Sequence, residues 1–312
     1  MGAPPVPRVT LNYGQDGAAP VPPGPMTAPK TATHFADIAP NYDVLLCDVW
    51  GVIHNGRESF PVACAALAKY RAEVGPVILI SNSPRPRGPV IEQLDGLGVP
   101  REAWSEIVTS GDATRVLLAE RAPGPVWTIG PPRDEALYEG LGLEFSELHD
   151  AKFVSVTGPY DDENDEPTDY RERFEACIER GLELICANPD IVVQRGDKLI
   201  YCGGALAQLY ESLGGKVTMA GKPYPAIYEI CLKLAGEKLG RPLDSRRVLC
   251  IGDGLPTDVR GANARGLDVL FVANGIHGAE TVGPAGLNAA VVEDLLRQEG
   301  LTAAWAMADM AW

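Results

Sequence analysis

The stretch Val44–His54, VLLCDVWGVIH, joins a continuous apolar run to a carboxylate at Asp48 and a tryptophan two residues later. Apolar residues at every position, rather than at alternate ones, predict a strand covered on both faces, as in a parallel sheet with crossover helices. Four similar runs follow along the chain: PVILISNS, KVTMAG, RRVLCIGDG and DVLFVANG. The sequence therefore predicts an α/β protein with a Rossmann-like parallel-sheet core, a fold that binds ligands at the carboxyl ends of its strands.

Polar side chains at or just past the ends of four of these runs have the chemistry of a phosphoryl-transfer site. Such a site needs a nucleophile, a hard cation held by oxygen ligands, hydrogen-bond donors and a positive charge. A carboxylate can attack phosphorus to give an aspartyl-phosphate, and Mg²⁺ accepts one or two carboxylates plus a backbone carbonyl. The candidates are Asp48 as nucleophile, Ser81 and Asn82 as donors, Lys222 as the cation, and Asp253, Asp258 and the Trp50 carbonyl as metal ligands.

The spacing of the runs predicts a second domain inside the first. Roughly 130 residues separate PVILISNS from KVTMAG, far more than one crossover helix requires. We expect an α/β cap over residues 122–216, inserted between core segments 36–121 and 217–312. Residues 1–35 are rich in Pro, Ala and Gly and predict a disordered tail, within which Met26 is an alternative start. The acidic run at 161–169 predicts a solvated loop.

Composition limits the partners and the compartment. The formal charge of −15 over 312 residues argues against sequence-independent binding of nucleic acid or anionic membranes, which need clustered Lys and Arg. Seven cysteines without a C-x-x-C pair are typical of a reducing compartment, so we expect a cytoplasmic protein. A dinucleotide-binding oxidoreductase and a P-loop kinase are both disfavoured, because neither glycine fingerprint is present.

The order of these motifs resembles the haloacid dehalogenase superfamily, and within it the NagD-like phosphatases with a class IIA (C2) cap. The resemblance rests on VLLCDVWGVIHNG, LISNS, AGKPYPAIYE and CIGDGLPTDVRGANARG, and it extends to ANPDIV and CGGALAQ in the inserted segment. It implies Mg²⁺ as cofactor, Asp48 as nucleophile, Ser81 and Asn82 as phosphate binders, Lys222 as the neutralising charge, and Asp253 with Asp258 as metal ligands. The implied substrate is a small phosphorylated metabolite of the sugar phosphate, nucleotide or pyridoxal phosphate type, and the cap is the expected contact of a homo-oligomer.

Trp50 departs from this family pattern, which usually places an acid-base aspartate there. Tryptophan can neither protonate a leaving alcohol nor activate water. Two readings stay open: a phosphatase whose acid comes from elsewhere, or a protein that binds phosphorylated ligands and turns them over poorly. His54 is the nearest titratable candidate for the missing acid, although a histidine without a catalytic role fits the same position.

Overall fold

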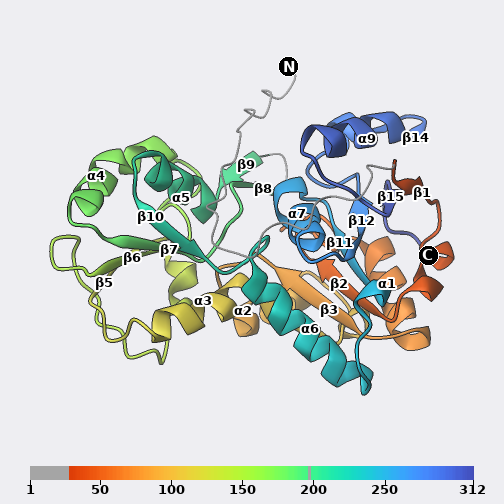
Figure 1. The fold of residues 1–312 in the computed structure, drawn as a ribbon, viewed down its shortest axis with the longest axis horizontal. Coiled ribbons are helices and arrows are strands. Elements are labelled where there is room, and N and C mark those ends of the chain that lie inside the picture. The colour runs from red at the N-terminus through yellow and green to blue at the C-terminus, as the bar shows by residue number, and fades with distance from the viewer. Residues whose placement is uncertain (1–27, 196–197) are drawn as a thin grey trace.

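A computed structural model describes residues 28–195 and 198–312, which form two lobes (Figure 1). The larger lobe is built on a sheet of seven parallel strands in the order β1-β15-β12-β11-β2-β3-β4. In that order the strands are Lys30–Thr31, Trp305–Met307, Asp268–Val272, Val248–Gly252, Val44–Asp48, Val77–Ser81 and Glu106–Thr109. The α/β class and the parallel core expected from the sequence are therefore confirmed.

Both faces of the core sheet are buried, which explains the continuous apolar runs. In β2, Leu45 and Cys47 pack on the side of α1 and α2, whereas Val44 and Leu46 face α6, α7 and α9. All four side chains are fully buried. Burial of each valine or leucine side chain stabilises the fold by about 1.5–3 kcal/mol. The core helices are α1 Pro61–Glu73, α2 Arg87–Gly96, α3 Ser110–Ala119, α6 Pro225–Leu239, α7 Arg260–Asn263, α8 Gly278–Thr281 and α9 Ala289–Gln298.

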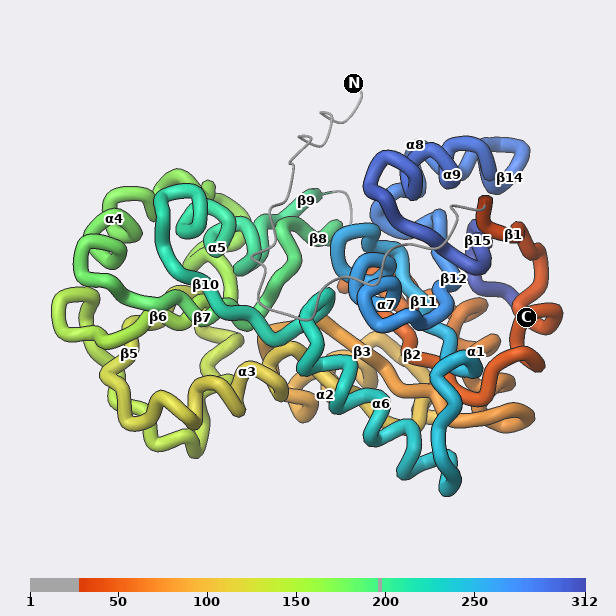
Figure 2. The backbone as a smooth tube through the Cα atoms, in the orientation of Figure 1, coloured from red at the N-terminus to blue at the C-terminus, as the bar shows by residue number. Residues whose placement is uncertain are grey.

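The smaller lobe, which we call the cap, has its own parallel sheet in the order β10-β7-β6-β5. Helices α4 and α5 pack on this sheet through Phe174 and Tyr210, whose rings meet edge to face with centroids 5.2 Å apart. An antiparallel hairpin, β8–β9, leaves the cap and lies between the two lobes (Figure 2). The cap elements are β5 Val126–Ile129, β6 Phe153–Val156, α4 Arg171–Glu179, β7 Glu183–Cys186, β8 Val192–Arg195, β9 Lys198–Tyr201, α5 Gly203–Ser212 and β10 Lys216–Met219.

One predicted core strand belongs to the other lobe. The run KVTMAG contains β10, which pairs in parallel with β7 of the cap, from Lys216 opposite Glu183 to Met219 opposite Cys186. The cap sheet thus extends three residues beyond the expected end at residue 216. In the core sheet, the strand that pairs with β3 on its outer side is β4, which the sequence analysis did not single out.

The disordered tail was expected to cover residues 1–35, but ordered structure begins before residue 35. Lys30 and Thr31 pair with Trp305 and Ala306 of β15, and Phe35 is fully buried. The Phe35 ring packs edge to face on Trp312, with ring centroids 6.0 Å apart. Residues 30–35 therefore belong to the larger lobe. The part of the predicted tail over residues 1–27, including Met26, lies outside the described residues.

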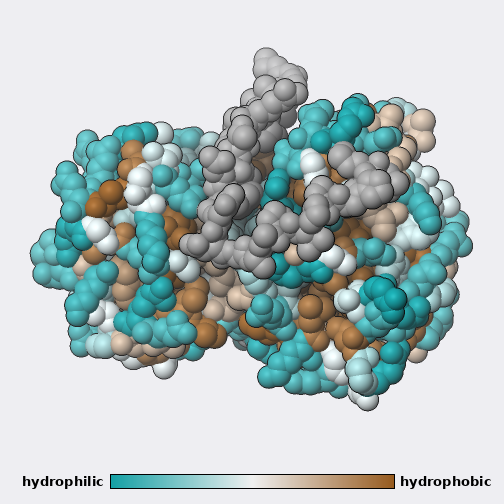
Figure 3. All heavy atoms as spheres, viewed as in Figure 1, coloured by the Kyte–Doolittle hydropathy of each residue, from teal (hydrophilic) through white to brown (hydrophobic). Residues whose placement is uncertain are grey.

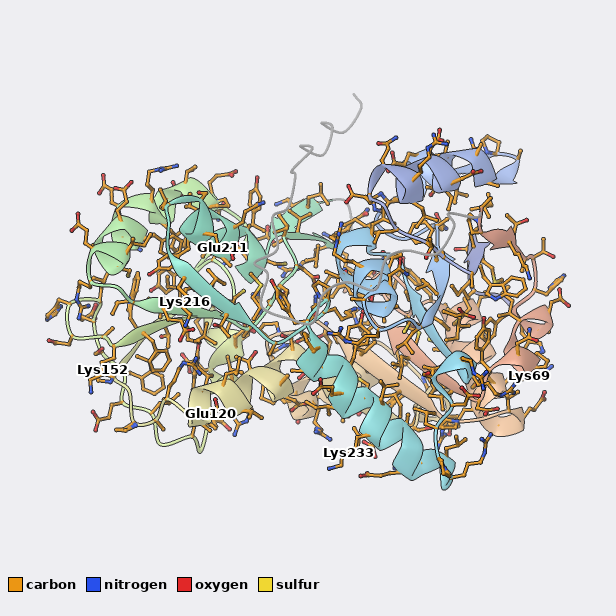
Figure 4. All side chains as sticks on the ribbon, viewed as in Figure 1. Lys69, Glu120, Lys152, Glu211, Lys216 and Lys233 are labelled. Atoms are coloured by element: carbon orange, nitrogen blue, oxygen red, sulfur yellow. The ribbon has the colours of Figure 1, made fainter. Side chains whose placement is uncertain are left out.

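The face of the molecule drawn in Figure 3 is mostly hydrophilic at its periphery. On the face drawn in Figure 3, polar residues cover most of the periphery of both lobes, and the hydrophobic patches among them are small. Charged side chains such as Lys152 on the cap and Lys233 on α6 point outward (Figure 4). Among the described residues, no helix is both long and apolar enough to cross a bilayer.

Candidate active site

Asp48, the last residue of β2, lies in a buried cluster with Lys222. The Lys222 ammonium donates to Asp48 Oδ1 at 2.6 Å and to Asp258 Oδ1 at 2.7 Å. Only 2% of Lys222 and 7% of Asp48 is exposed, so water screens these pairs poorly. Burial alone would lower the pKa of Lys222, but Asp258 and Asp48 raise it above its ordinary value. Lys222 is therefore a fixed positive charge beside the predicted nucleophile.

Three carboxylates converge at this point. Asp48, Asp253 and Asp258 each place an oxygen within 4.8 Å of the others. Burial and the neighbouring Asp258 raise the pKa of Asp48 well above its usual range, and the same two causes raise the pKa of Asp253 to about 7. One ammonium cannot neutralise three buried carboxylates, so a divalent cation fits this cluster in both charge and ligand type.

Backbone groups fix the two later carboxylates. The Ile276 N–H donates to Asp253 Oδ2 at 2.7 Å, and the Gly254 N–H donates to Asp258 Oδ2 at 3.1 Å. Gly51 has a φ of +89°, and a Cβ there would lie 2.2 Å from Asp253 Oδ2. Glycine is thus required where the loop after β2 passes the cluster. Coordination by the Trp50 carbonyl in this loop stays a prediction.

Ser81 ends β3, Asn82 follows it, and both line the same cleft as Asp48. The Asn82 amide donates to the Lys222 carbonyl at 3.1 Å and accepts from the Lys222 N–H at 2.7 Å. It also donates to Asp190 Oδ1 at 2.8 Å. Asn82 therefore holds the Lys222 backbone in place and connects the core to the cap residue Asp190.

Asp190 is a cap carboxylate that the sequence analysis did not single out as a site residue, although it lies within the quoted ANPDIV. Burial raises its pKa, and the nearby Lys222 charge opposes that shift. Asp190 and its neighbour Asn188 line the cleft together with the core residues. The cap thus covers the carboxyl ends of the core strands.

Trp50 reaches from the core to the cap hairpin. Its indole N–H donates to the carbonyl oxygen of Gln194 in β8 at 2.7 Å. Its ring also packs edge to face on His54, with centroids 5.1 Å apart. Gly56 leaves room for the indole, because a Cβ at Gly56 would lie 2.4 Å from the ring. The Trp50 side chain therefore contacts the cap, at the position where the family that the sequence resembles usually has an aspartate.

His54 does not have the properties of a general acid near neutral pH. It is almost fully buried, and burial, followed by repulsion from Arg85, lowers its pKa to about 4. Its Nδ1 accepts from the Gly56 N–H at 2.9 Å. The ring is thus neutral, with Nδ1 as an acceptor and the proton on Nε2.

A cleft of about 1510 Å³ runs between the lobes. Its lining combines the acidic cluster and Ser81 and Asn82 from the core with residues of the cap and of the β8–β9 hairpin. The acidic run at 161–169 is only partly the solvated loop that its charge predicted. Asp162 in this run lines the cleft, has a side chain only 10% exposed, and pairs with Arg133 and Arg195.

Comparisons with known proteins agree with this geometry. Residues 45–144 match the family described as haloacid dehalogenase-like hydrolase, and residues 219–297 match the related family described as HAD-hydrolase-like. A solved structure of a haloacid dehalogenase-like hydrolase from Brucella suis 1330 is 44% identical, with a TM-score of 0.81. The match covers 89% of this chain and 99% of that one. The chain belongs to the haloacid dehalogenase-like hydrolases.

Curated relatives place the chain in the NagD-like branch. The D-glycerol 3-phosphate phosphatase of Mycobacterium tuberculosis is 29% identical over 253 residues, which cover 78% of this chain and 66% of that protein. The ribonucleotide monophosphatase NagD of Escherichia coli K12 is 25% identical over 247 residues, covering 76% of this chain and 90% of NagD. The resemblance expected from the sequence is therefore confirmed, and these relatives are phosphatases.

Proposed function

We propose that the protein is a Mg²⁺-dependent phosphatase of small phosphorylated metabolites that works through an aspartyl-phosphate at Asp48. The observation that carries this proposal is the pairing of one ammonium, Lys222 Nζ, with both Asp48 and Asp258 in a buried cluster of three carboxylates. These residues would supply a nucleophile, a cation and metal ligands at the cleft that Asp48, Asp253 and Asp258 line.

The proposed reaction has two steps. An Asp48 carboxylate oxygen forms a bond to phosphorus as the P–O bond to the leaving group breaks, and the leaving group departs with that electron pair. Water then attacks the aspartyl-phosphate, which releases inorganic phosphate and a proton and restores the carboxylate. Lys222 offsets the repulsion between the anionic nucleophile and the phosphoryl group.

Mg²⁺ would be held by Asp48, Asp253, Asp258 and the Trp50 carbonyl. When bound, it supplies Lewis-acid stabilisation of the phosphoryl oxygens. Ser81 would donate a hydrogen bond to the same group through its hydroxyl, and Asn82 through its backbone N–H, because both hydrogens of the Asn82 side-chain amide are bound by Asp190 and the Lys222 carbonyl. The cap would exclude water from the cleft and select the substrate.

Trp50 sets the leaving-group preference in this proposal. The indole cannot protonate a departing alkoxide, and the low pKa of His54 leaves that ring without an acidic proton at neutral pH. Positioned acid catalysis contributes a factor of about 10²–10⁴. Aryl and acyl phosphates, whose leaving groups depart as stable anions, should therefore react faster than sugar or other alkyl phosphates.

A phospholigand-binding protein with little turnover is the second candidate, and the engagement of Trp50 by the cap hairpin favours it. Release of phosphate from 4-nitrophenyl phosphate with Mg²⁺, measured beside Asp48→Asn, separates the two. Release that depends on Asp48 supports the enzyme. No release, together with calorimetric binding of glycerol 3-phosphate to the unmodified protein, supports the binding protein.

Two wider expectations belong to the proposal. A reducing, cytoplasmic setting is supported by seven buried cysteines, all of them free thiols. Association of two copies through the cap is supported by Phe145 and Tyr160, whose side chains are large, apolar in part, and 61% and 41% exposed. The backbone of Phe145 forms a β-bridge with Val126 of the edge strand β5. Light scattering of the protein beside Phe145→Ser tests that contact.

A further inference from the structure

Three arginines line the cleft together with the acidic cluster. Arg85 comes from the loop after β3, Arg133 from the 3-10 helix Pro132–Leu137 of the cap, and Arg195 from the end of β8. Arginine is suited to carboxylate and phosphate groups because its planar donors bind two oxygens at once. The proposed reaction at Asp48 has no use for these three cations.

Two of the three arginines are already paired. Arg133 and Arg195 both bind Asp162 Oδ2, Arg195 at 2.8 Å. Arg195 also lies 3.8 Å from Glu163 Oε1. Burial would raise the pKa of Asp162, but hydrogen bonds from Arg195 and Arg133 lower it overall. Asp162 is therefore ionised, and it holds the two cap arginines in position on their side of the cleft.

Arg85 lacks a comparable acid. Its guanidinium donates to the neutral Gln93 Oε1 of α2, and among residues 28–195 and 198–312 no carboxylate lies within ion-pair distance of it. Burial lowers its pKa; Asp134 opposes that shift, and repulsion from Arg133 and Arg195 adds to it. Asp134 does not form an ion pair with Arg85, and the arginine that it contacts is Arg133, at 4.0 Å.

A half-buried cation that faces two other cations is costly unless an anion joins it. The cleft has the room, since about 1510 Å³ far exceeds the volume of one phosphoryl group. All three arginines line this cleft, and Arg133 and Arg195 repel Arg85, so an anion beside Arg85 would offset that repulsion. The phosphoryl group itself is expected at the carboxylate cluster, whose paired cation is Lys222 and not Arg85, so we assign the anion beside Arg85 to another part of the ligand.

We propose that Arg85, supported by Arg133 and Arg195, forms a second anion subsite, and that the substrate carries a carboxylate or a further phosphate besides the phosphoryl group that is removed. This inference rests on the proposed phosphatase function and narrows its substrate class. It concerns affinity for the rest of the substrate, whereas Asp48 and Lys222 concern bond breaking.

Two matched pairs of substrates test the subsite. 3-Phosphoglycerate differs from glycerol 3-phosphate by a carboxylate, and fructose 1,6-bisphosphate differs from fructose 6-phosphate by a second phosphate. We expect kcat/KM to favour the more anionic member of at least one pair by about tenfold or more, the size of one charge-assisted hydrogen bond. The pair that shows the preference identifies the group and its distance from the reacting phosphate.

Arg85→Gln should remove that preference. The substitution should lower kcat/KM for the more anionic substrate about tenfold more than it lowers kcat/KM for 4-nitrophenyl phosphate. Arg85→Lys should restore part of the preference. The matched control is Arg87→Gln, since Arg87 lies outside the cleft and pairs with Asp112 at 3.3 Å. Circular dichroism melting curves establish that each variant is folded.

The outcomes separate the subsite from the phosphatase proposal. If 4-nitrophenyl phosphate is hydrolysed but neither pair shows, in kcat/KM or as competitive inhibitors of that hydrolysis, a preference that Arg85→Gln removes, the subsite is refuted and the phosphatase stands. If nothing is hydrolysed, the phosphatase fails. Calorimetric binding of the same four compounds to the unmodified protein and to Arg85→Gln then decides the subsite: equal affinities within each pair refute it, and a preference that depends on Arg85 supports it.

Discussion

Replacing Trp50 with Phe isolates the contact between the core and the cap hairpin. Phenylalanine keeps an aromatic ring against His54 but has no N–H for the Gln194 carbonyl, which the indole reaches at 2.7 Å. A neutral hydrogen bond contributes about 0.5–1.5 kcal/mol, which corresponds to about a 2- to 12-fold change in an equilibrium. If this bond stabilises the cap over the cleft, substrate binding should weaken by that factor.

The assay is steady-state hydrolysis of 4-nitrophenyl phosphate at saturating Mg²⁺. KM should rise by about 2- to 12-fold in Trp50→Phe, with kcat changed less, because the nucleophile and the metal ligands are untouched. Trp50→Tyr has the same ring size as Trp50→Phe but carries an O–H donor, so comparing the two variants separates the loss of a donor from the loss of the larger indole ring. A KM equal to that of the unmodified protein in both variants would refute a role for this bond in holding the cap.

Three further results are expected. Trp50→Asp should raise turnover of alkyl phosphates by about tenfold or more, with a smaller gain on 4-nitrophenyl phosphate, because it supplies the missing acid-base group; a fall on alkyl phosphates would mean that another group donates the proton. Lys222→Ala should reduce phosphate release to the level of a blank, whereas Lys233→Ala, an exposed lysine on α6 (Figure 4), should leave it unchanged; release by Lys222→Ala at the unmodified rate would contradict the charge role. Asp43→Asn should lower the free energy of unfolding by about 1 kcal/mol at pH 7, because Asp43 pairs with Arg241 at 2.6 Å and Arg247 at 2.8 Å. The Arg247 hydrogen bond lowers the pKa of Asp43, so this difference should vanish as the pH falls below 4, and a difference that persists in acid would show another cause.

The central strands of the core and the carboxylate cluster were predictable because both depend on local patterns. Continuous apolar runs specify strands buried on both faces, and parallel strands bring the residues at their carboxyl ends to one edge of the sheet. Asp48, Asp253 and Asp258 meet for this reason. Lys222 joins them from the segment that follows β10, a strand of the cap sheet. Its position in the cluster was foreseen, but the sheet to which the preceding strand belongs was not.

Membership of a sheet is a long-range property, which explains that error. KVTMAG has the same apolar pattern as a core strand, and only its pairing with β7 places it in the cap. The arginines of the cleft are hidden for the same reason. Arg85, Arg133 and Arg195 lie far apart in the chain, and Asp162 belongs to an acidic run that is typical of solvent-exposed loops. The fold of the cap brings Arg133, Arg195 and Asp162 together, and Arg85 shares their cleft because the cap lies over the core.

The most direct test of the account compares the unmodified protein with Asp48→Asn in release of inorganic phosphate from 4-nitrophenyl phosphate, with Mg²⁺ present and after its removal by EDTA. Asparagine keeps the size of the side chain but removes the anionic nucleophile. We expect release by the unmodified protein that stops with EDTA and returns with added Mg²⁺, and release at the level of the blank for a folded Asp48→Asn. Wild-type rates in Asp48→Asn at saturating Mg²⁺ would contradict the assignment of Asp48 as the nucleophile.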